Sequence, residues 1–248
     1  MTAELLTDER SHFDRFGYIS PIRVRTPTEA AAITQQWDQV EEREQLPQEE
    51  RFLMYNRHRD LDFLMDIASD ERVLDIVESL IGPDILLFGT RLICKWPGDV
   101  DFVPWHQDVS VRNQLTPPEQ VTGWYAVDNV TTDNGCVQVI PGSHHDGMLT
   151  REPANHAGSL LRHNEETPVS EERRCDALPI ELQAGEMSLH HGFTLHTSGP
   201  NPSTERRCGY VIRYVPAYVQ QGDDVEVNQR ETAILLRGVD PFSESLTA

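Results

Sequence analysis

Residues 124–140, Trp-Tyr-Ala-Val-Asp-Asn-Val-Thr-Thr-Asp-Asn-Gly-Cys-Val-Gln-Val-Ile, carry the clearest indication of the fold. Two apolar runs, 124–127 and 136–140, hold the β-branched and aromatic residues that favour strands. Asp133-Asn134-Gly135 lies between them and tolerates positive φ, so the stretch predicts a β-hairpin. Further strand-like runs occur on both sides, at residues 85–88, 92–94, 180–182 and 210–214. Many short strands joined by tight turns favour a jelly roll.

The front of the chain has the periodicity of helices instead. Thr26-Pro27-Thr28-Glu29 combines a capping box with a proline in the first turn, and apolar residues follow at helical spacing. A second helical pattern runs from residue 73 to 81. We therefore expect a mainly β (α+β) fold in one domain spanning residues 1–248. Residues 1–84 are predicted to form a helical support region, and residues 85–220 a double-stranded β-helix core of the cupin-like jelly-roll type.

Composition and charge limit the kinds of partner. The 248 residues include 41 Asp and Glu but 21 Lys and Arg, which gives a formal net charge of −20. Such a charge argues against nucleic acid and anionic membranes, because both attract basic proteins. The sequence has no apolar run of membrane-spanning length and no signal-peptide pattern at its start. We expect a cytoplasmic protein that acts on a small molecule, and the sequence leaves its oligomeric state open.

The four cysteines, Cys94, Cys136, Cys175 and Cys208, show neither a C-x-x-C spacing nor the density of a disulfide scaffold. Such a pattern is typical of reduced thiols in a cytoplasmic protein. We therefore expect no disulfide bond.

His106-Gln107-Asp108 is the candidate metal-binding motif. Residues i and i+2 of a strand point to the same side, so His106 and Asp108 can bind one ion while Gln107 faces elsewhere. His-x-Asp also occurs at His58 and His144, beside a helical pattern and after a turn, and we expect both to be solvated loop or helix-end residues. With a second imidazole, the motif near His106 would complete the set of two histidines and one carboxylate that holds Fe(II) on one face.

The second imidazole is expected from a later strand. His190, His191 and His196 are the candidates, and the turn that follows His196 favours it. A basic pair, Arg206-Arg207, comes next, with Arg207 eleven residues after His196. A guanidinium at this place could anchor a small dicarboxylate beside the metal. The whole pattern is typical of an iron- and 2-oxoglutarate-dependent oxygenase.

Three blocks of the sequence together resemble the phytanoyl-CoA dioxygenase family. They are residues 105–108, 135–144 and 196–203, the last leading into Arg206-Arg207. The resemblance extends from about residue 5 to about residue 215 and implies a jelly-roll oxygenase that uses Fe(II), 2-oxoglutarate as co-substrate, and O2. It also places the distal metal ligand at His196 and the anion-binding arginine at Arg207, which leaves Arg206 as a surface residue.

The same resemblance implies further contacts with 2-oxoglutarate. Ser198 would help to hold the carboxylate that pairs with Arg207. Trp124 matches a position that the family uses beside the co-substrate, although an ordinary core aromatic is the alternative interpretation. Halogenating relatives carry a small residue where this chain has Asp108. The carboxylate therefore favours hydroxylation, with release of succinate and CO2, while desaturation, ring closure and epimerisation stay open.

Two functions of other classes also stay open. A metal-binding jelly roll can be a cofactor-independent isomerase or hydrolase, or a non-catalytic sensor of a small acid. The isomerase or hydrolase would have no use for Arg207. The net charge of −20 makes a polyanionic coenzyme-A thioester less natural as a substrate, despite the name of the family.

Residues 144–178 have weak periodicity and many charged residues. Long segments of this kind are often functional, so we expect a lid over the mouth of the active site, with a solvated loop as the alternative. Strand alternation suggests four further residues as parts of the substrate pocket: Arg91, Trp105, Gln107 and Arg213.

Overall fold

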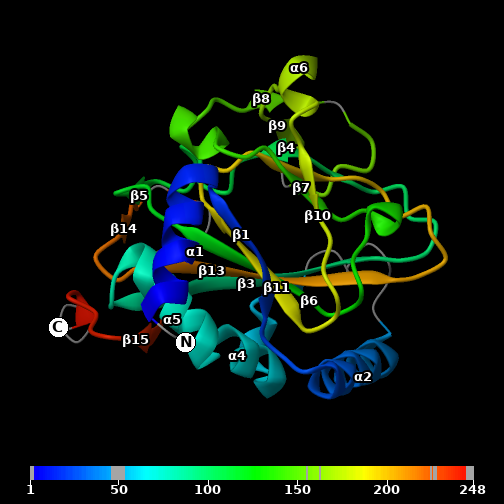
Figure 1. Ribbon diagram of the computed structural model, residues 1–248, viewed down its shortest axis with the longest axis horizontal. Coiled ribbons are helices and arrows are strands. Elements are labelled where there is room, and N and C mark those ends of the chain that lie inside the picture. The colour runs from blue at the N-terminus through cyan, green and yellow to red at the C-terminus, as the bar shows by residue number, and fades with distance from the viewer. Residues whose placement is uncertain are drawn as a thin grey trace.

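The computed structural model describes residues 3–45, 54–154, 156–161, 163–223, 225 and 228–243 (Figure 1). The described helices are α1 (Ala3–Phe16), α2 (Pro27–Glu44), α4 (Asp62–Ala68), α5 (Glu71–Ile81) and α6 (Glu171–Arg174), with the 3-10 turns η1 (Arg57–Arg59), η2 (Thr132–Asn134), η3 (Ser143–Asp146) and η4 (Arg230–Thr232). The described strands are β1 (Tyr18–Arg23), β2 (Met54–Tyr55), β3 (Ile85–Lys95), β4 (Val103–His106), β5 (Leu115–Thr116), β6 (Val121–Ala126), β7 (Val137–Val139), β8 (Glu152–Pro153), β9 (Glu165–Glu166), β10 (Leu178–Ile180), β11 (Glu186–His191), β12 (His196–Ser198), β13 (Arg207–Pro216), β14 (Gln220–Gln221) and β15 (Ile234–Arg237).

The two predicted helices form where their end signals lie. At the start of α2, the backbone N–H of Thr26 donates to the Glu29 carboxylate at 2.8 Å, which completes the predicted capping box. The α5 helix begins after Asp70, whose side chain accepts a hydrogen bond from the backbone N–H of Arg72, and ends at Gly82. No helix in the described ranges is long and apolar enough to cross a membrane.

Two antiparallel sheets face each other and form the predicted double-stranded β-helix. The major sheet has the order β1-β11-β6-β13-β3-β15, with β2 beside β3, and the minor sheet has the order β10-β7-β12-β4. Side chains from their inner faces meet in one apolar cluster, in which Trp124 and Val211 of the major sheet pack with Val137 and Ile180 of the minor sheet. The jelly roll expected from the sequence is confirmed.

The helices cover the other face of the major sheet. Figure 1 shows α2, α4 and α5 on the side of this sheet that faces away from β4, β7 and β10. Alternation along the strands explains the division: Trp124 points into the jelly roll, while its neighbour Tyr125 packs with Trp37 and other helix residues. The helical layer therefore covers the outer face of the major sheet and leaves its inner face for the site.

The hairpin predicted at Asp133-Asn134-Gly135 is wrong. Strand β6 pairs with β11 and β13 in the major sheet, whereas β7 pairs with β10 and β12 in the minor sheet. The residue types nevertheless suit the turn, since Gly135 has a φ of 78° and a Cβ there would lie 2.4 Å from the carbonyl oxygen of Pro200. The turn carries the chain from one sheet to the other.

The major sheet also takes strands from outside residues 85–220. Strand β1 comes from the region expected to be helical and pairs with β11, and β15 pairs with β3. The expectation of reduced thiols is wrong for two cysteines, because Cys94 and Cys208 form a disulfide between β3 and β13. They are 114 residues apart in the sequence but are register partners. Cys136 and Cys175 are free thiols.

Candidate active site

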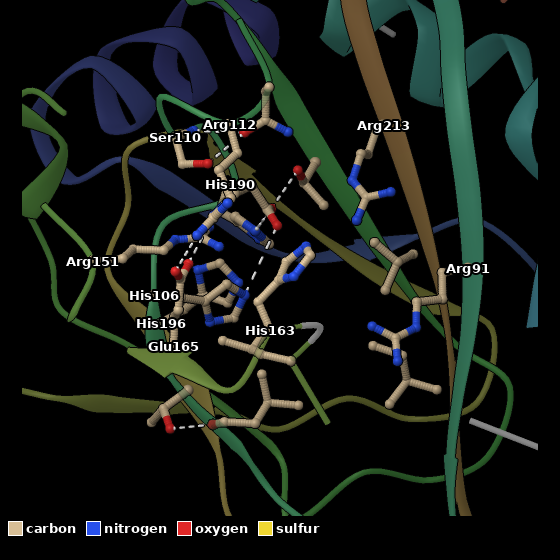
Figure 2. Close-up of a pocket in the computed structure, with 18 of the residues that line it drawn as sticks. Arg91, His106, Ser110, Arg112, Arg151, His163, Glu165, His190, His196 and Arg213 are labelled. Carbon is tan, nitrogen blue, oxygen red and sulfur yellow. Dashed lines mark hydrogen bonds and ion pairs between the residues drawn. The ribbon is translucent and has the colours of Figure 1, made fainter. Parts of the chain in front are cut away.

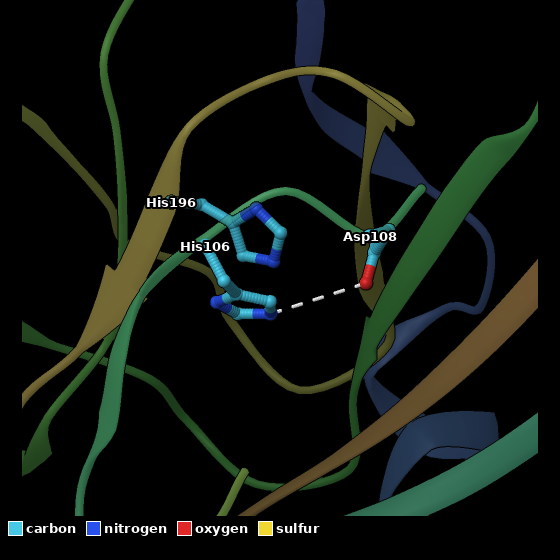
Figure 3. A group of neighbouring side chains, drawn as sticks. All are labelled: His106, Asp108 and His196. Atoms are coloured by element: carbon cyan, nitrogen blue, oxygen red, sulfur yellow. Dashed lines mark ion pairs between the residues drawn. The ribbon is translucent and has the colours of Figure 1, made fainter. Parts of the chain in front are cut away.

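The strand pair β4–β12 of the minor sheet brings three potential metal ligands together. His106 ends β4, His196 begins β12 and is its register partner, and Asp108 follows in the bend after β4. Ligand atoms of the three side chains lie within 4.8 Å of one another, and His106 Nε2 is 4.0 Å from Asp108 Oδ1 (Figure 3). Two imidazoles and one carboxylate on one side of a site could hold a metal ion such as Fe(II).

Backbone carbonyls orient both imidazoles. The Nδ1 atom of His106 lies 2.9 Å from the Pro104 carbonyl oxygen, and Nδ1 of His196 lies 2.9 Å from the Thr194 carbonyl oxygen. Each Nδ1 therefore carries the hydrogen and donates it, which leaves Nε2 as the metal-binding atom. Burial lowers the pKa of His196 to about 4 and holds the pKa of His106 well below its usual range. Both rings are thus neutral at pH 7, as metal ligands must be.

The Asp108 carboxylate is held by one of its two oxygens. Its Oδ2 accepts hydrogen bonds from Thr122 Oγ1 at 2.6 Å and from His190 Nε2 at 2.9 Å, which leaves Oδ1 for a metal. Burial acts to raise the pKa of Asp108, but the hydrogen bond from His190 and the nearby positive charges outweigh it and hold the pKa well below the usual range. The carboxylate is therefore ionised.

The other histidines considered from the sequence lie outside the three-residue cluster. His190 donates from Nε2 to Asp108 Oδ2, and His191 Nδ1 accepts a hydrogen bond from the Phe193 backbone N–H at 3.0 Å. The expectation that His58 is solvated is wrong, because it is buried and its Nδ1 lies 2.8 Å from Thr90 Oγ1. His144 is half-buried and its Nε2 lies 3.2 Å from the Asp14 carbonyl oxygen.

Arg207 lies at the start of β13 and lines the same cavity as the metal ligands. One nitrogen, Nη2, donates to the Gly135 carbonyl oxygen at 2.7 Å and to Ser198 Oγ at 3.3 Å. The guanidinium carbon lies 5.4 Å from the centre of the Trp124 ring. Burial lowers the pKa of Arg207 to about 10, so the side chain is still a cation at neutral pH. Trp124 belongs to the apolar core and also lines the cavity, and its place beside the co-substrate stays a prediction.

Lys95 is a site residue that the sequence did not suggest. It is the register partner of Arg207, is fully buried, and donates from Nζ to Ser198 Oγ at 2.8 Å. No described carboxylate lies within ion-pair distance of either Lys95 or Arg207, and Nε of Arg207 is buried without a hydrogen-bond partner among the described residues. Burial and the charge of Arg207 hold the pKa of Lys95 well below its usual range, whereas Arg207 stays a cation. A buried charge such as that of Arg207 without a counterion costs roughly several kcal/mol, so this end of the cavity suits an anion. One carboxylate of 2-oxoglutarate fits that requirement.

Arg206 points to a different part of the molecule. Its guanidinium forms ion pairs with three acids, Asp128 at 2.8 Å, Asp38 at 2.7 Å and Glu41 at 2.6 Å. These contacts tie β13 to α2, outside the cavity. Of the arginine pair, therefore, only Arg207 lies where it can meet a ligand near the candidate metal centre.

The cavity has a volume of about 970 Å³ and is lined by residues from both sheets and from the 144–178 segment. Met148, Leu149 and Arg151 of that segment lie along it, and Figure 2 shows Arg151 beside the histidines. Of the four pocket residues suggested by alternation, Arg91 and Arg213 line the cavity. Trp105 and Gln107 do not. Trp105 packs in a separate apolar cluster.

Gln107 holds the 147–149 loop. Its Nε2 donates to the carbonyl oxygens of Gly147 and Phe193, both at 2.8 Å, and its Oε1 accepts from the Leu149 backbone N–H at 2.8 Å. The residue between the two candidate ligands thus faces away from the metal centre, as predicted from strand alternation. It connects the centre to the segment that lines the cavity.

The sequence model of the family described as "Phytanoyl-CoA dioxygenase (PhyH)" matches residues 13–209. The chain belongs to this family. A phytanoyl-CoA dioxygenase of Arabidopsis thaliana is 35% identical over 124 residues, which are 50% of this chain and 42% of that protein. An L-proline trans-4-hydroxylase of Streptomyces griseoviridis is 27% identical over 157 residues, 57% of this chain and 59% of that protein. The chain spans about half the length of the curated relatives it matches.

Solved structures of similar proteins share the fold almost from end to end. The apo form of the non-heme monooxygenase ThoJ has a TM-score of 0.74 and 27% identity, and the match covers 94% of this chain and 85% of that one. CytC3 with Fe(II) and alpha-ketoglutarate has a TM-score of 0.67 and 26% identity, with 98% and 91% covered. Family members therefore bind Fe(II) and 2-oxoglutarate on this fold, and His106, Asp108 and His196 could hold the metal here.

Proposed function

We propose that this chain is a non-haem Fe(II)- and 2-oxoglutarate-dependent oxygenase that hydroxylates a small molecule and releases succinate and CO2. The observation that carries the proposal is the cluster of His106, Asp108 and His196 in one cavity with the buried cation Arg207. When bound, iron would couple the oxidative decarboxylation of 2-oxoglutarate by O2 to the oxidation of a substrate C–H bond.

The chain's own residues bind and orient in this proposal. His106, Asp108 and His196 would hold the metal and leave its remaining coordination positions for other ligands. Arg207 pairs with the far carboxylate of 2-oxoglutarate. The Ser198 hydroxyl accepts hydrogen bonds from Lys95 and Arg207, so its own hydrogen is free to be donated to the same carboxylate.

Hydroxylation is favoured over halogenation because Asp108 occupies a ligand position with a fixed negative charge. A second, uncompensated anion in a buried site would be costly. We also propose a cytoplasmic location and a small molecule, not nucleic acid or a membrane, as the partner, because the net charge of −20 disfavours polyanionic partners.

Succinate formation tests the proposal. Purified protein with Fe(II), 2-oxoglutarate and O2 is expected to release succinate, and His196→Ala is expected to release none. Zinc in place of iron should give no succinate. Succinate-free turnover of a small molecule with zinc would instead favour an isomerase or hydrolase, and binding of an acid without any turnover would favour a sensor. In the presence of chloride or bromide, mass spectrometry of the product should find no halogen.

A further inference from the structure

The charge of the cavity is opposite to that of the chain. The whole sequence has 41 acidic and 21 basic residues, but the described lining includes five arginines and two carboxylates. The arginines are Arg91, Arg112, Arg151, Arg207 and Arg213, and the carboxylates are Asp108 and Glu165. An acidic protein that collects arginines on the wall of one cavity creates a local positive potential there, which attracts anions.

Both carboxylates already have partners. Asp108 accepts hydrogen bonds from Thr122 and His190, and Glu165 forms an ion pair with Arg112 whose Nε–Oε2 distance is 2.9 Å. Arg151 and Arg213 have no carboxylate within ion-pair distance among the described residues. These two guanidinium groups thus face the cavity without a counterion.

Arg213 is the arginine of the cavity whose guanidinium group is most available to a ligand. It is half-buried, and within the described ranges it makes no hydrogen bond and no ion pair. Arg151 donates from Nη2 to the Gln107 carbonyl oxygen, but its Nε is buried with no partner in the same ranges. Figure 2 shows Arg91 and Arg213 on one wall and Arg151 on the other, with the candidate metal ligands His106 and His196 on the same side as Arg151. The space between the two walls is bordered by cations.

Strand geometry separates these cations from the end that suits 2-oxoglutarate. Arg207 and Arg213 lie on the same face of β13. They are six residues apart, so their Cα atoms are separated by about 20 Å of strand. On β3, Lys95 pairs with Arg207, and Arg91 pairs with Val211, which lies two residues before Arg213. A five-carbon diacid is much shorter than that distance. Because Gly135 and Ser198 hold the Arg207 guanidinium at its own end of the strand, we assign Arg213 to a different group from the carboxylate that Arg207 is proposed to bind.

The like charges also act on one another. Burial lowers the pKa of Arg91 and of Arg151, and the charge of Arg213 acts in the same direction on both, although the Asp108 and Glu165 carboxylates raise the pKa of Arg151. An oxyanion between the arginines would reduce the repulsion among them. The planar guanidinium group matches carboxylate and phosphoryl oxygens in a two-bond contact.

We propose that Arg213, together with Arg91 and Arg151, binds an anionic group of the prime substrate, either a carboxylate or a phosphoryl group. This inference rests on the proposed function, because it assigns the opposite end of the cavity to 2-oxoglutarate. The oxygenase is accordingly specific for a small organic acid, and the arginines hold it by its charged group so that a C–H bond lies near the metal centre.

Calorimetry with simple probes tests the assignment. The iron-loaded protein is kept free of O2 and saturated with 2-oxoglutarate, so that the Arg207 end is occupied. Phenylacetate and phenylphosphonate are then titrated, with neutral phenylacetamide as the matched uncharged probe. At least one of the two anions should bind, and the better one identifies the substrate class. Arg213→Gln should weaken its binding about tenfold or more, the effect of losing one charge-assisted contact.

Arg43→Gln is the matched control, because it removes the same charge from an exposed side chain on α2, far from the cavity lining. It should change the binding of the anion less than twofold, roughly, by long-range electrostatics alone. Equal binding of the amide and the acid, unchanged binding to Arg213→Gln, or no saturable binding of either anion would overturn the inference. Loss of 2-oxoglutarate binding in the first step would instead contradict the proposed function.

Discussion

The strand pair β3–β13 carries basic side chains near its two ends, and the surroundings of these two groups differ. At the inner end, Lys95 and Arg207 are fully buried and bonded to fixed acceptors such as Ser198. At the outer end, Arg213 is half-buried and has no hydrogen-bond or ion-pair partner among the described residues. The two proposals therefore give the same kind of side chain two purposes. A cation that is enclosed and held in place suits a co-substrate, which is the same in every reaction. A more open cation suits the prime substrate, which differs between enzymes of one family.

The largest effect is expected from loss of a metal ligand, because both the co-substrate and the substrate are proposed to react at the metal centre. His196→Ala removes one of three metal ligands. Loss of a residue that only hydrogen-bonds to a metal ligand costs up to about 100-fold in affinity, so loss of the ligand itself should lower iron binding and succinate formation by more than that. His144→Ala, in another His-x-Asp copy, should retain most activity. Equal activity of the two variants, measured as succinate release, would remove His196 from the site.

The inner end is tested by Arg207→Ala. Loss of a charge-assisted contact in an enclosed pocket costs about 2–4 kcal/mol, which should raise the KM for 2-oxoglutarate roughly 30- to 1000-fold. Arg206→Ala should leave this KM nearly unchanged but lower the stability of the fold, because Arg206 binds three acids outside the cavity. The reverse ranking of the two KM values would exchange the roles of the arginines.

His190→Gln tests the support of the metal ligand Asp108. A glutamine does not reproduce the hydrogen bond from His190 Nε2 to Asp108 Oδ2 in length and direction. Iron affinity should fall about 10- to 100-fold, with a smaller change in the KM for 2-oxoglutarate. Titration with Fe(II) in the absence of O2 measures the first quantity. An iron affinity equal to that of the unmodified protein would make His190 a packing residue only.

The smallest effect is expected from Lys95→Met, which keeps the length of the side chain and removes the amino group that donates to Ser198. Ser198 would lose one of its two donors, and the KM for 2-oxoglutarate should rise about three- to tenfold, as for one hydrogen bond of about 0.5–1.5 kcal/mol. The kcat should change less than the KM. A KM within experimental error of the unmodified value would show that Arg207 alone sets the affinity of the inner end.

Local sequence signals predicted much of the site and of the helical layer. The spacing of His106 and Asp108 needs only the geometry of one strand, and the start of α2 needs only the residues of its own cap. Alternation also suggested four pocket residues, of which Arg91 and Arg213 line the cavity and Trp105 and Gln107 do not. The metal-ligand spacing and the helix cap each involve residues that are close together in the chain, which made them predictable.

Features that depend on strand register were not predictable in this way. The contact of His190 with Asp108 depends on the pairing of β6 with β11, and Lys95 meets Arg207 only because β3 pairs with β13. The same register joins Cys94 to Cys208. A single sequence does not state which strands pair. The turn at residues 133–135 shows the limit, since its residues indicate a sharp turn but not which sheet the next strand joins.

The assignment of Arg207 to the co-substrate can be tested by locating 2-oxoglutarate in an O2-free crystal of the iron-loaded protein. We predict that the far carboxylate lies against the Arg207 guanidinium and the Ser198 hydroxyl, with the keto acid end at the metal held by His106, Asp108 and His196. A far carboxylate bound to Arg213, with Arg207 contacting only protein atoms, would contradict it.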